Sequence, residues 1–190
     1  MKPAIAVLTL ALAALFPLVS ATPAEACAMR KIAAPIAGEE YVAQGIAAEA
    51  RGELHTAIRH YERAMNASKG VAQADAAVRA ARLHHKLGAS DRAINRLNRA
   101  VAAAPRFLEA RVLLGRALTA SNPAEAIPHF EVALQLGATG DLHAEMALAA
   151  ARAGRAELAR THLDLARQHG AAVEHILAAE EALGVGVAVL

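Results

Sequence analysis

The side chains best able to do chemistry in this 190-residue chain are nine histidines, one cysteine and many arginines. Catalysis requires a nucleophile beside a base, paired carboxylates, or a glycine-rich loop that cradles phosphate, and the sequence shows none of these patterns. Haem attachment requires Cys-x-x-Cys-His, yet Cys27 is the only cysteine. The sequence therefore predicts a protein that is not an enzyme and that carries no cofactor.

The histidines are the remaining candidates for a metal site. His55 and His60 stand five residues apart, which does not place them on one helix face, and the adjacent His84 and His85 point in different directions on a helix. We therefore expect no metal site and interpret the histidines as exposed or half-buried helix residues. A histidine-based metal-binding accessory protein is an alternative, which requires distant histidines to converge in the fold.

Apolar residues at helical spacing define the elements that must position these side chains. Ala93, Leu97 and Ala100 stand at i, i+4 and i+7, which is one face of an α-helix. The same triplet recurs from residues 57, 126 and 159, so the period is 36 residues once and 33 residues twice. Such a period predicts an array of helical hairpins. Asn122 and Pro123 predict the start of one helix, and Pro128 then predicts a kink or a late start of that helix.

Over residues 38–171 this pattern resembles the tetratricopeptide repeat family. That family has a small residue eighth in the first helix of each pair, where this chain has Gly45, Ala81, Gly115 and Ala147. A small and a large residue follow on the second helix, here Ala57 and Tyr61, Ala93 and Leu97, Ala126 and Phe130, and Ala159 and Leu163. The closing proline is present only as Pro105. Another helical-hairpin array is the alternative.

The resemblance implies an all-α fold, a right-handed α-solenoid of about four hairpins, with residues 172–190 forming a capping helix and an apolar tail. It also implies a concave groove lined by the first helices. In this register the groove residues are Arg79, Arg82, His85, Lys86, Val112, Arg116 and Arg152. Because arginine grips a carboxylate through two parallel hydrogen bonds, an acidic peptide or protein partner would suit the groove.

Two observations weigh against a carboxylate-binding groove. The Lys and Asn pattern of the clamp in chaperone-binding tetratricopeptide domains is missing. Arginines on amphipathic helices also commonly solvate a face and pair with neighbouring glutamates. The net charge of only +2, without a polybasic tract, argues against a nucleic-acid partner.

We therefore expect a protein-interaction scaffold, and the resemblance implies a role in assembling envelope machinery. A structural scaffold that self-associates through the apolar C-terminal tail is an alternative function. The sequence leaves the oligomeric state open.

Residues 1–28 have the layout of a secretory signal peptide. One charge at Lys2 precedes an apolar stretch over residues 4–19, and small residues at 21, 26 and 28 offer cleavage sites. A membrane anchor is the alternative, although the stretch is shorter than the roughly 20 residues of a membrane span. We expect an exported protein, periplasmic or secreted, with no membrane span after cleavage and a flexible linker over residues 29–37. A lipid anchor through Cys27 is an alternative, but Ala24 stands where a lipoprotein box usually has Leu.

Overall fold

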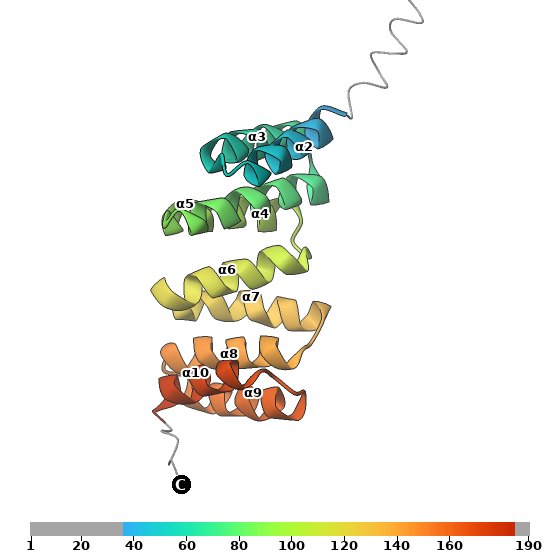
Figure 1. Cartoon of the computed structure of the whole chain (residues 1–190). Coiled ribbons are helices and arrows are strands. Elements are labelled where there is room, and N and C mark those ends of the chain that lie inside the picture. Colours follow the sequence, from blue (N-terminus) through green and yellow to red (C-terminus); the bar gives the residue numbers. More distant parts are fainter. Residues whose placement is uncertain (1–35, 185–190) are drawn as a thin grey trace, which may run out of the picture. The chain divides into compact units, whose positions relative to one another are not determined.

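The computed structural model describes residues 36–184, all within Pro35–Leu190, the second of the two units into which contacts divide the chain. The predicted signal peptide, Cys27, the linker before residue 36 and the tail after residue 184 lie outside the described residues. Within 36–184 the chain forms α-helices joined by turns (Figure 1). They are α2 (Ile36–Ala50), α3 (Leu54–Ala67), α4 (Gly70–Lys86), α5 (Ser90–Ala103), α6 (Leu108–Ser121), α7 (Pro123–Leu136), α8 (Gly140–Arg152), α9 (Ala156–Gln168) and α10 (Val173–Leu183).

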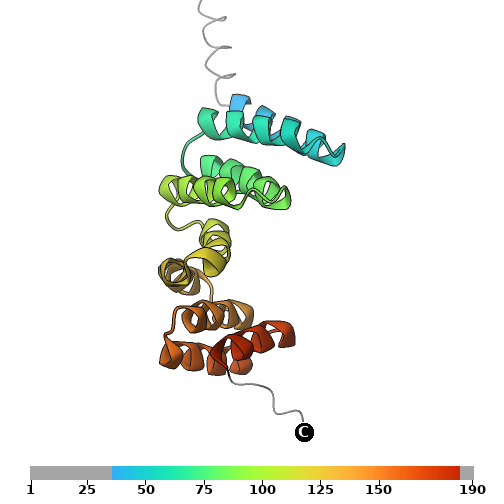
Figure 2. The same ribbon diagram turned by 90° about the vertical axis from the view of Figure 1, so that its left-hand side faces the viewer.

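Consecutive helices pair into four hairpins, α2–α3, α4–α5, α6–α7 and α8–α9. Each hairpin contacts the next through α3 and α4, through α5 and α6, and through α7 and α8. The hairpins therefore stack in chain order, as the two views show (Figures 1 and 2). This arrangement confirms the prediction of an all-α solenoid built from four helical hairpins.

The turn within the second hairpin shows why the sequence reverses direction there. Gly88 follows α4 with a φ of 73°, in the left-handed region that residues with a Cβ atom rarely adopt. The Ala89 N–H then donates to the His84 carbonyl, which satisfies one of the free acceptors at the end of α4. Positive-φ glycines at 52 and 154 make the corresponding turns of the first and fourth hairpins.

The small residues of the first helices lie against the large residues of the second helices. Gly115 faces the Phe130 ring so closely that a Cβ atom built there would stand 2.8 Å from a ring carbon. Gly45 faces Tyr61 in the same way. The second and fourth hairpins instead bury alanine with leucine, namely Ala81 with Leu97 and Ala147 with Leu163. The helices therefore approach closely by matching glycine to an aromatic ring and alanine to an aliphatic side chain.

The predicted late start of the helix at Pro128 is wrong. Helix α7 begins at Pro123 and continues through Pro128, whose side chain is exposed. Proline there costs one backbone hydrogen bond, but buried Ile127 and Phe130 hold the opposite face of the helix in the core. The Asn122 side chain makes no capping hydrogen bond, and its backbone carbonyl accepts from the Glu125 N–H at 3.0 Å instead.

Helix α10 packs against both helices of the last hairpin. Ala179 is fully buried and shares a core cluster with Ala147 and Leu163. The Ala172 N–H, just before the helix, donates to Asp141 Oδ1 at 2.8 Å. This bond satisfies one of the free donors at the start of α10 and fixes the helix to α8.

Candidate functional site

A groove of about 540 Å³ opens where α4, α5 and α6 meet, and we call it the α4–α6 groove. Spacings of three or four recur among its lining residues, as between 82 and 85, 93 and 97, and 113 and 116, so each helix turns one stripe toward it. Buried Ala81, Ala93 and Leu97 form an apolar floor. The other lining residues are Arg82, His85, Leu113, Arg116 and Ala117.

The two arginines of the α4–α6 groove pair with carboxylates of this chain. Arg82 on α4 forms an ion pair with Glu109 on α6. Arg116 on α6 donates from Nε to Glu145 on α8 at 2.9 Å, and this bond raises the pKa of Arg116. Each pair thus links one hairpin to the next, and the arginines orient polar groups above an apolar floor.

The structure brings three of the seven predicted groove residues together, namely Arg82, His85 and Arg116. The other four do not line the groove. Arg79 donates to Asp75 one turn earlier at 2.8 Å, Lys86 and Arg152 are exposed, and Val112 is half-buried against the core. The interpretation that arginines pair with neighbouring acids therefore describes Arg79, Arg82 and Arg116.

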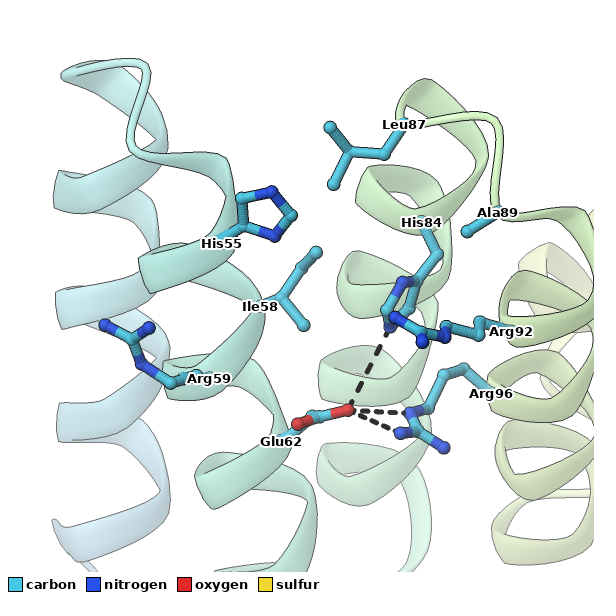
Figure 3. Close-up of a pocket in the computed structure, with 9 residues that line it drawn as sticks. All are labelled: His55, Ile58, Arg59, Glu62, His84, Leu87, Ala89, Arg92 and Arg96. Atoms are coloured by element: carbon cyan, nitrogen blue, oxygen red, sulfur yellow. Dashed lines mark hydrogen bonds and ion pairs between the residues drawn. The ribbon is translucent and has the colours of Figure 1, made fainter.

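A second cavity, of about 410 Å³, lies where α3, the end of α4 and α5 meet (Figure 3), and we call it the α3–α5 pocket. It occupies a different side of α4, because His84 faces it while His85 faces the α4–α6 groove. Ile58, Leu87 and Ala89 supply apolar lining. The remaining lining residues are titratable or charged: His55, Arg59, Glu62, His84, Arg92 and Arg96.

Sequence reasoning missed the α3–α5 pocket, and the repeat pattern holds no signal for it. The first two hairpins are offset by 36 residues, so Arg59 corresponds to Asn95 and Arg92 corresponds to Thr56. The repeat therefore does not place cations at matching positions of α3 and α5. The period also does not reveal the space between α3 and α5 that Glu62, His84 and Arg92 line.

Three histidines converge near the last hairpin. His143 on α8 and His162 on α9 bring their Nδ1 atoms to 3.0 Å, and the His169 ring stacks on His143 with centroids 5.5 Å apart. Burial lowers the pKa of both His143 and His162. Across the described residues, 36–184, no group of three or more His, Cys, Asp or Glu side chains is arranged to hold a metal ion.

No helix within residues 36–184 has the length and apolar character of a membrane span. Scans of the sequence against family models and against curated proteins find no match.

Solved structures with similar folds are tetratricopeptide repeat proteins. YrrB, described as a TPR protein with an unusual peptide-binding site, is 22% identical, with a TM-score of 0.64 over 76% of this chain and 75% of its own. MamA is 19% identical, with a TM-score of 0.66 over 80% of this chain and 85% of its own. A thermophilic TPR protein from Thermus thermophilus, TTC0263, is 23% identical, with a TM-score of 0.56 over 79% of this chain and 84% of its own.

Residues 36–184 thus form an α-solenoid whose stacked hairpins enclose their core between neighbours. Its fold is that of the tetratricopeptide repeat proteins.

Proposed function

We propose that the chain is a protein-interaction scaffold that binds a peptide, or an exposed segment of a partner protein, in the α4–α6 groove. The observation that carries this proposal is the apolar floor of Ala81, Ala93 and Leu97 beside Arg82 and Arg116. The likeness in fold to YrrB, which is described as having a peptide-binding site, supports peptide binding as the mode.

The partner segment that suits this groove combines an apolar side chain with an adjacent carboxylate. The floor offers apolar surface to an anchoring side chain. Arg82 and Arg116 already hold Glu109 and Glu145, so an incoming carboxylate has to exchange with an acid of this chain. Apolar contact therefore supplies most of the affinity, and the arginines set the orientation of the segment.

A peptide-display selection against the full-length chain tests the proposal. We expect selected peptides to share an apolar residue next to Asp or Glu. Ala117→Phe fills the groove and should abolish their binding, whereas Ala124→Phe, at an exposed position of α7, should leave it unchanged. Circular dichroism verifies that both variants stay helical. Peptides that bind Ala117→Phe as well as wild type would refute the groove as the site.

Charge reversal tests the acidic preference separately. Arg82→Glu should weaken binding of the selected acidic peptides and favour basic ones. Arg79→Glu changes the charge of the same helix outside the groove and serves as the matched control. Equal effects of the two variants would show that only the general charge of α4 matters.

We propose that the protein acts after export, in the cell envelope, where it assists the assembly of a larger machine. The signal-like residues 1–28 support this location. Fractionation of a bacterial host should find the full-length chain outside the cytoplasm and a chain lacking residues 1–28 inside it. Cys27→Ser should leave the fraction unchanged, and its release from the membrane fraction would instead indicate a lipid anchor.

Self-association is a second candidate function, favoured by one observation on α10. Val173 and Leu177 stand one turn apart and are 67% and 44% exposed. Light scattering should show a mass that rises with concentration and that Val173→Glu with Leu177→Glu reduces to that of one chain. A constant single-chain mass for the wild type would eliminate this candidate.

A further inference from the structure

The α3–α5 pocket carries more positive charge than the chain neutralises. Glu62 is its only carboxylate, and it accepts from Arg96 Nε at 3.1 Å. Arg59 donates only to the hydroxyl of Thr56, at 3.2 Å. Arg92 forms no ion pair and no side-chain hydrogen bond with any residue between 36 and 184. The Arg59 guanidinium points away from the other lining residues (Figure 3), so Arg92 supplies the guanidinium that is available to an anion from outside.

His84 is a buried polar group that lacks a partner in this pocket. The residue is 5% exposed, and its Nε2 atom has no hydrogen-bond partner among the described residues. The nearest carboxylate oxygen, Glu62 Oε1, lies 4.0 Å away, beyond hydrogen-bond distance (Figure 3). Buried polar atoms are nearly always hydrogen-bonded, so a ligand in this pocket can supply the bond that the Nε2 atom of His84 lacks.

The surroundings of His84 lower the pKa of its ring and so favour the neutral form. Burial is the largest cause of the lowered pKa of His84. The charge of Arg96 lowers this pKa further, and the charge of Arg92 has a smaller effect in the same direction. Glu62 acts in the opposite direction, and His55 adds to the lowering. An anion placed among these groups would offset the positive charges and favour a protonated ring that donates a hydrogen bond.

The pocket also offers an apolar wall to the rest of a ligand. Ile58 on α3 is buried, and Leu87, just after α4, is 40% exposed. The volume of about 410 Å³ exceeds what a single phosphate ion fills and lies within the range of small-molecule sites. The ligand therefore combines an anionic end with an apolar body.

We propose that the α3–α5 pocket binds a small organic oxyanion, of the phosphate-monoester class, with its anionic oxygens between Arg92 and His84 and its apolar body against Ile58 and Leu87. Arginine suits this role because its planar donor groups bind two phosphate oxygens at once. The site is separate from the peptide groove, because it lies on a different side of α4 and shares no lining residue with it.

Calorimetric titration of the full-length chain with phenyl phosphate tests this site. We expect saturable one-to-one binding that Arg92→Gln weakens at least tenfold. Arg99→Gln is the matched control, because Arg99 lies on the same helix and is exposed but does not line the pocket. Neither arginine contacts a carboxylate within residues 36–184, so both variants should fold as the wild type does. Equal affinity of Arg92→Gln and wild type, or absence of binding, would overturn the proposal.

Two further arms test the parts of the proposal. Inorganic phosphate should bind at least several times more weakly than phenyl phosphate, and equal affinity would overturn the role of the apolar wall. Titration near pH 6.5 in two buffers of different ionisation enthalpy should reveal proton uptake on binding. His84→Gln should reduce that uptake, and uptake that is unchanged in a folded His84→Gln variant would overturn the assignment of His84.

Discussion

The two sides of α4 use arginine in different ways. Toward α6, Arg82 pairs with Glu109, and across the same groove Arg116 pairs with Glu145, so each guanidinium joins successive hairpins. Toward α3 and α5, Glu62 neutralises Arg96, and Arg92 forms no ion pair with an acid among residues 36–184. The contrast teaches that the acids of the neighbouring hairpin decide which arginines are available to a ligand.

This difference also separates structural from recognition roles. An arginine that holds an acid of the next hairpin stabilises the stack, and its removal leaves a carboxylate without a partner. An arginine without such an acid contributes little to folding, so its removal should change binding alone. The following predictions test that division, beginning with the largest effect.

Phe130→Ala should disrupt the α4–α6 groove while sparing the α3–α5 pocket. The ring is fully buried against Gly115, and its loss should lower the free energy of unfolding by about 3–5 kcal/mol. The stability of a repeat array is the sum of the stability of each hairpin and of the interfaces between neighbouring hairpins. The loss of structure should therefore concentrate in α6 and α7. Urea unfolding followed by circular dichroism measures the loss, and phenyl phosphate titration reports on the pocket.

Phe107→Ala is the control for that change. Its ring is only half-buried, so a smaller loss is expected. If Phe130→Ala abolishes both binding sites together, the array behaves as one cooperative unit and the two sides of α4 are not independent.

Arg116→Ala should destabilise the chain more than Arg92→Ala. Without Arg116, Glu145 is left unpaired with a side chain only 12% exposed, so a loss of about 1.5–3 kcal/mol is expected. Arg92→Ala should stay within about 0.5 kcal/mol of wild type. A double-mutant cycle with Glu145→Gln isolates the pair, and a coupling energy near zero would contradict the structural role of Arg116.

Acidification should reduce stability by a smaller amount. Burial lowers the pKa of His84, His129, His143 and His162 below the ordinary 6.5, so the folded state favours their neutral rings. As the pH falls below about 6.5, the unfolded chain binds protons first, and the free energy of unfolding decreases until the folded-state pKa values are passed.

Urea unfolding at a series of pH values between about 7 and 5 measures this slope. His162→Gln should flatten it, because the variant removes one of the two Nδ1 atoms that meet at 3.0 Å. Adding phenyl phosphate should also flatten it in the wild type but not in Arg92→Gln. A slope of the opposite sign would contradict the assignment of neutral rings.

The fold was predictable from the sequence because its determinants are local. The period of the small and large residues predicted the hairpins, and in the second hairpin Gly88 supplies the left-handed turn. Pro128 led to the wrong prediction of a late helix start. The burial of Ile127 and Phe130 on either side of it stabilises the helix by more than the proline destabilises it.

The candidate sites were less predictable, because they depend on which side chains meet between hairpins. Helical spacing placed Arg82 and Arg116 on first helices, but not Glu109 and Glu145 opposite them. Long side chains choose partners after the hairpins have stacked, so a charge count along one helix overestimates the free charge. The gap beside His84 likewise arises from the packing of three helices.

The matching of Gly45 with Tyr61 and of Gly115 with Phe130 has a consequence for how such chains can be rebuilt. Both members of each match lie in one hairpin, so a recombination point between hairpins transfers them together. A crossover inside a hairpin could pair an aromatic ring with an alanine Cβ atom, for which there is no room. The whole hairpin is therefore the unit that can be exchanged between related arrays. Chimaeric arrays should fold only when the junction between the two parent sequences lies between hairpins.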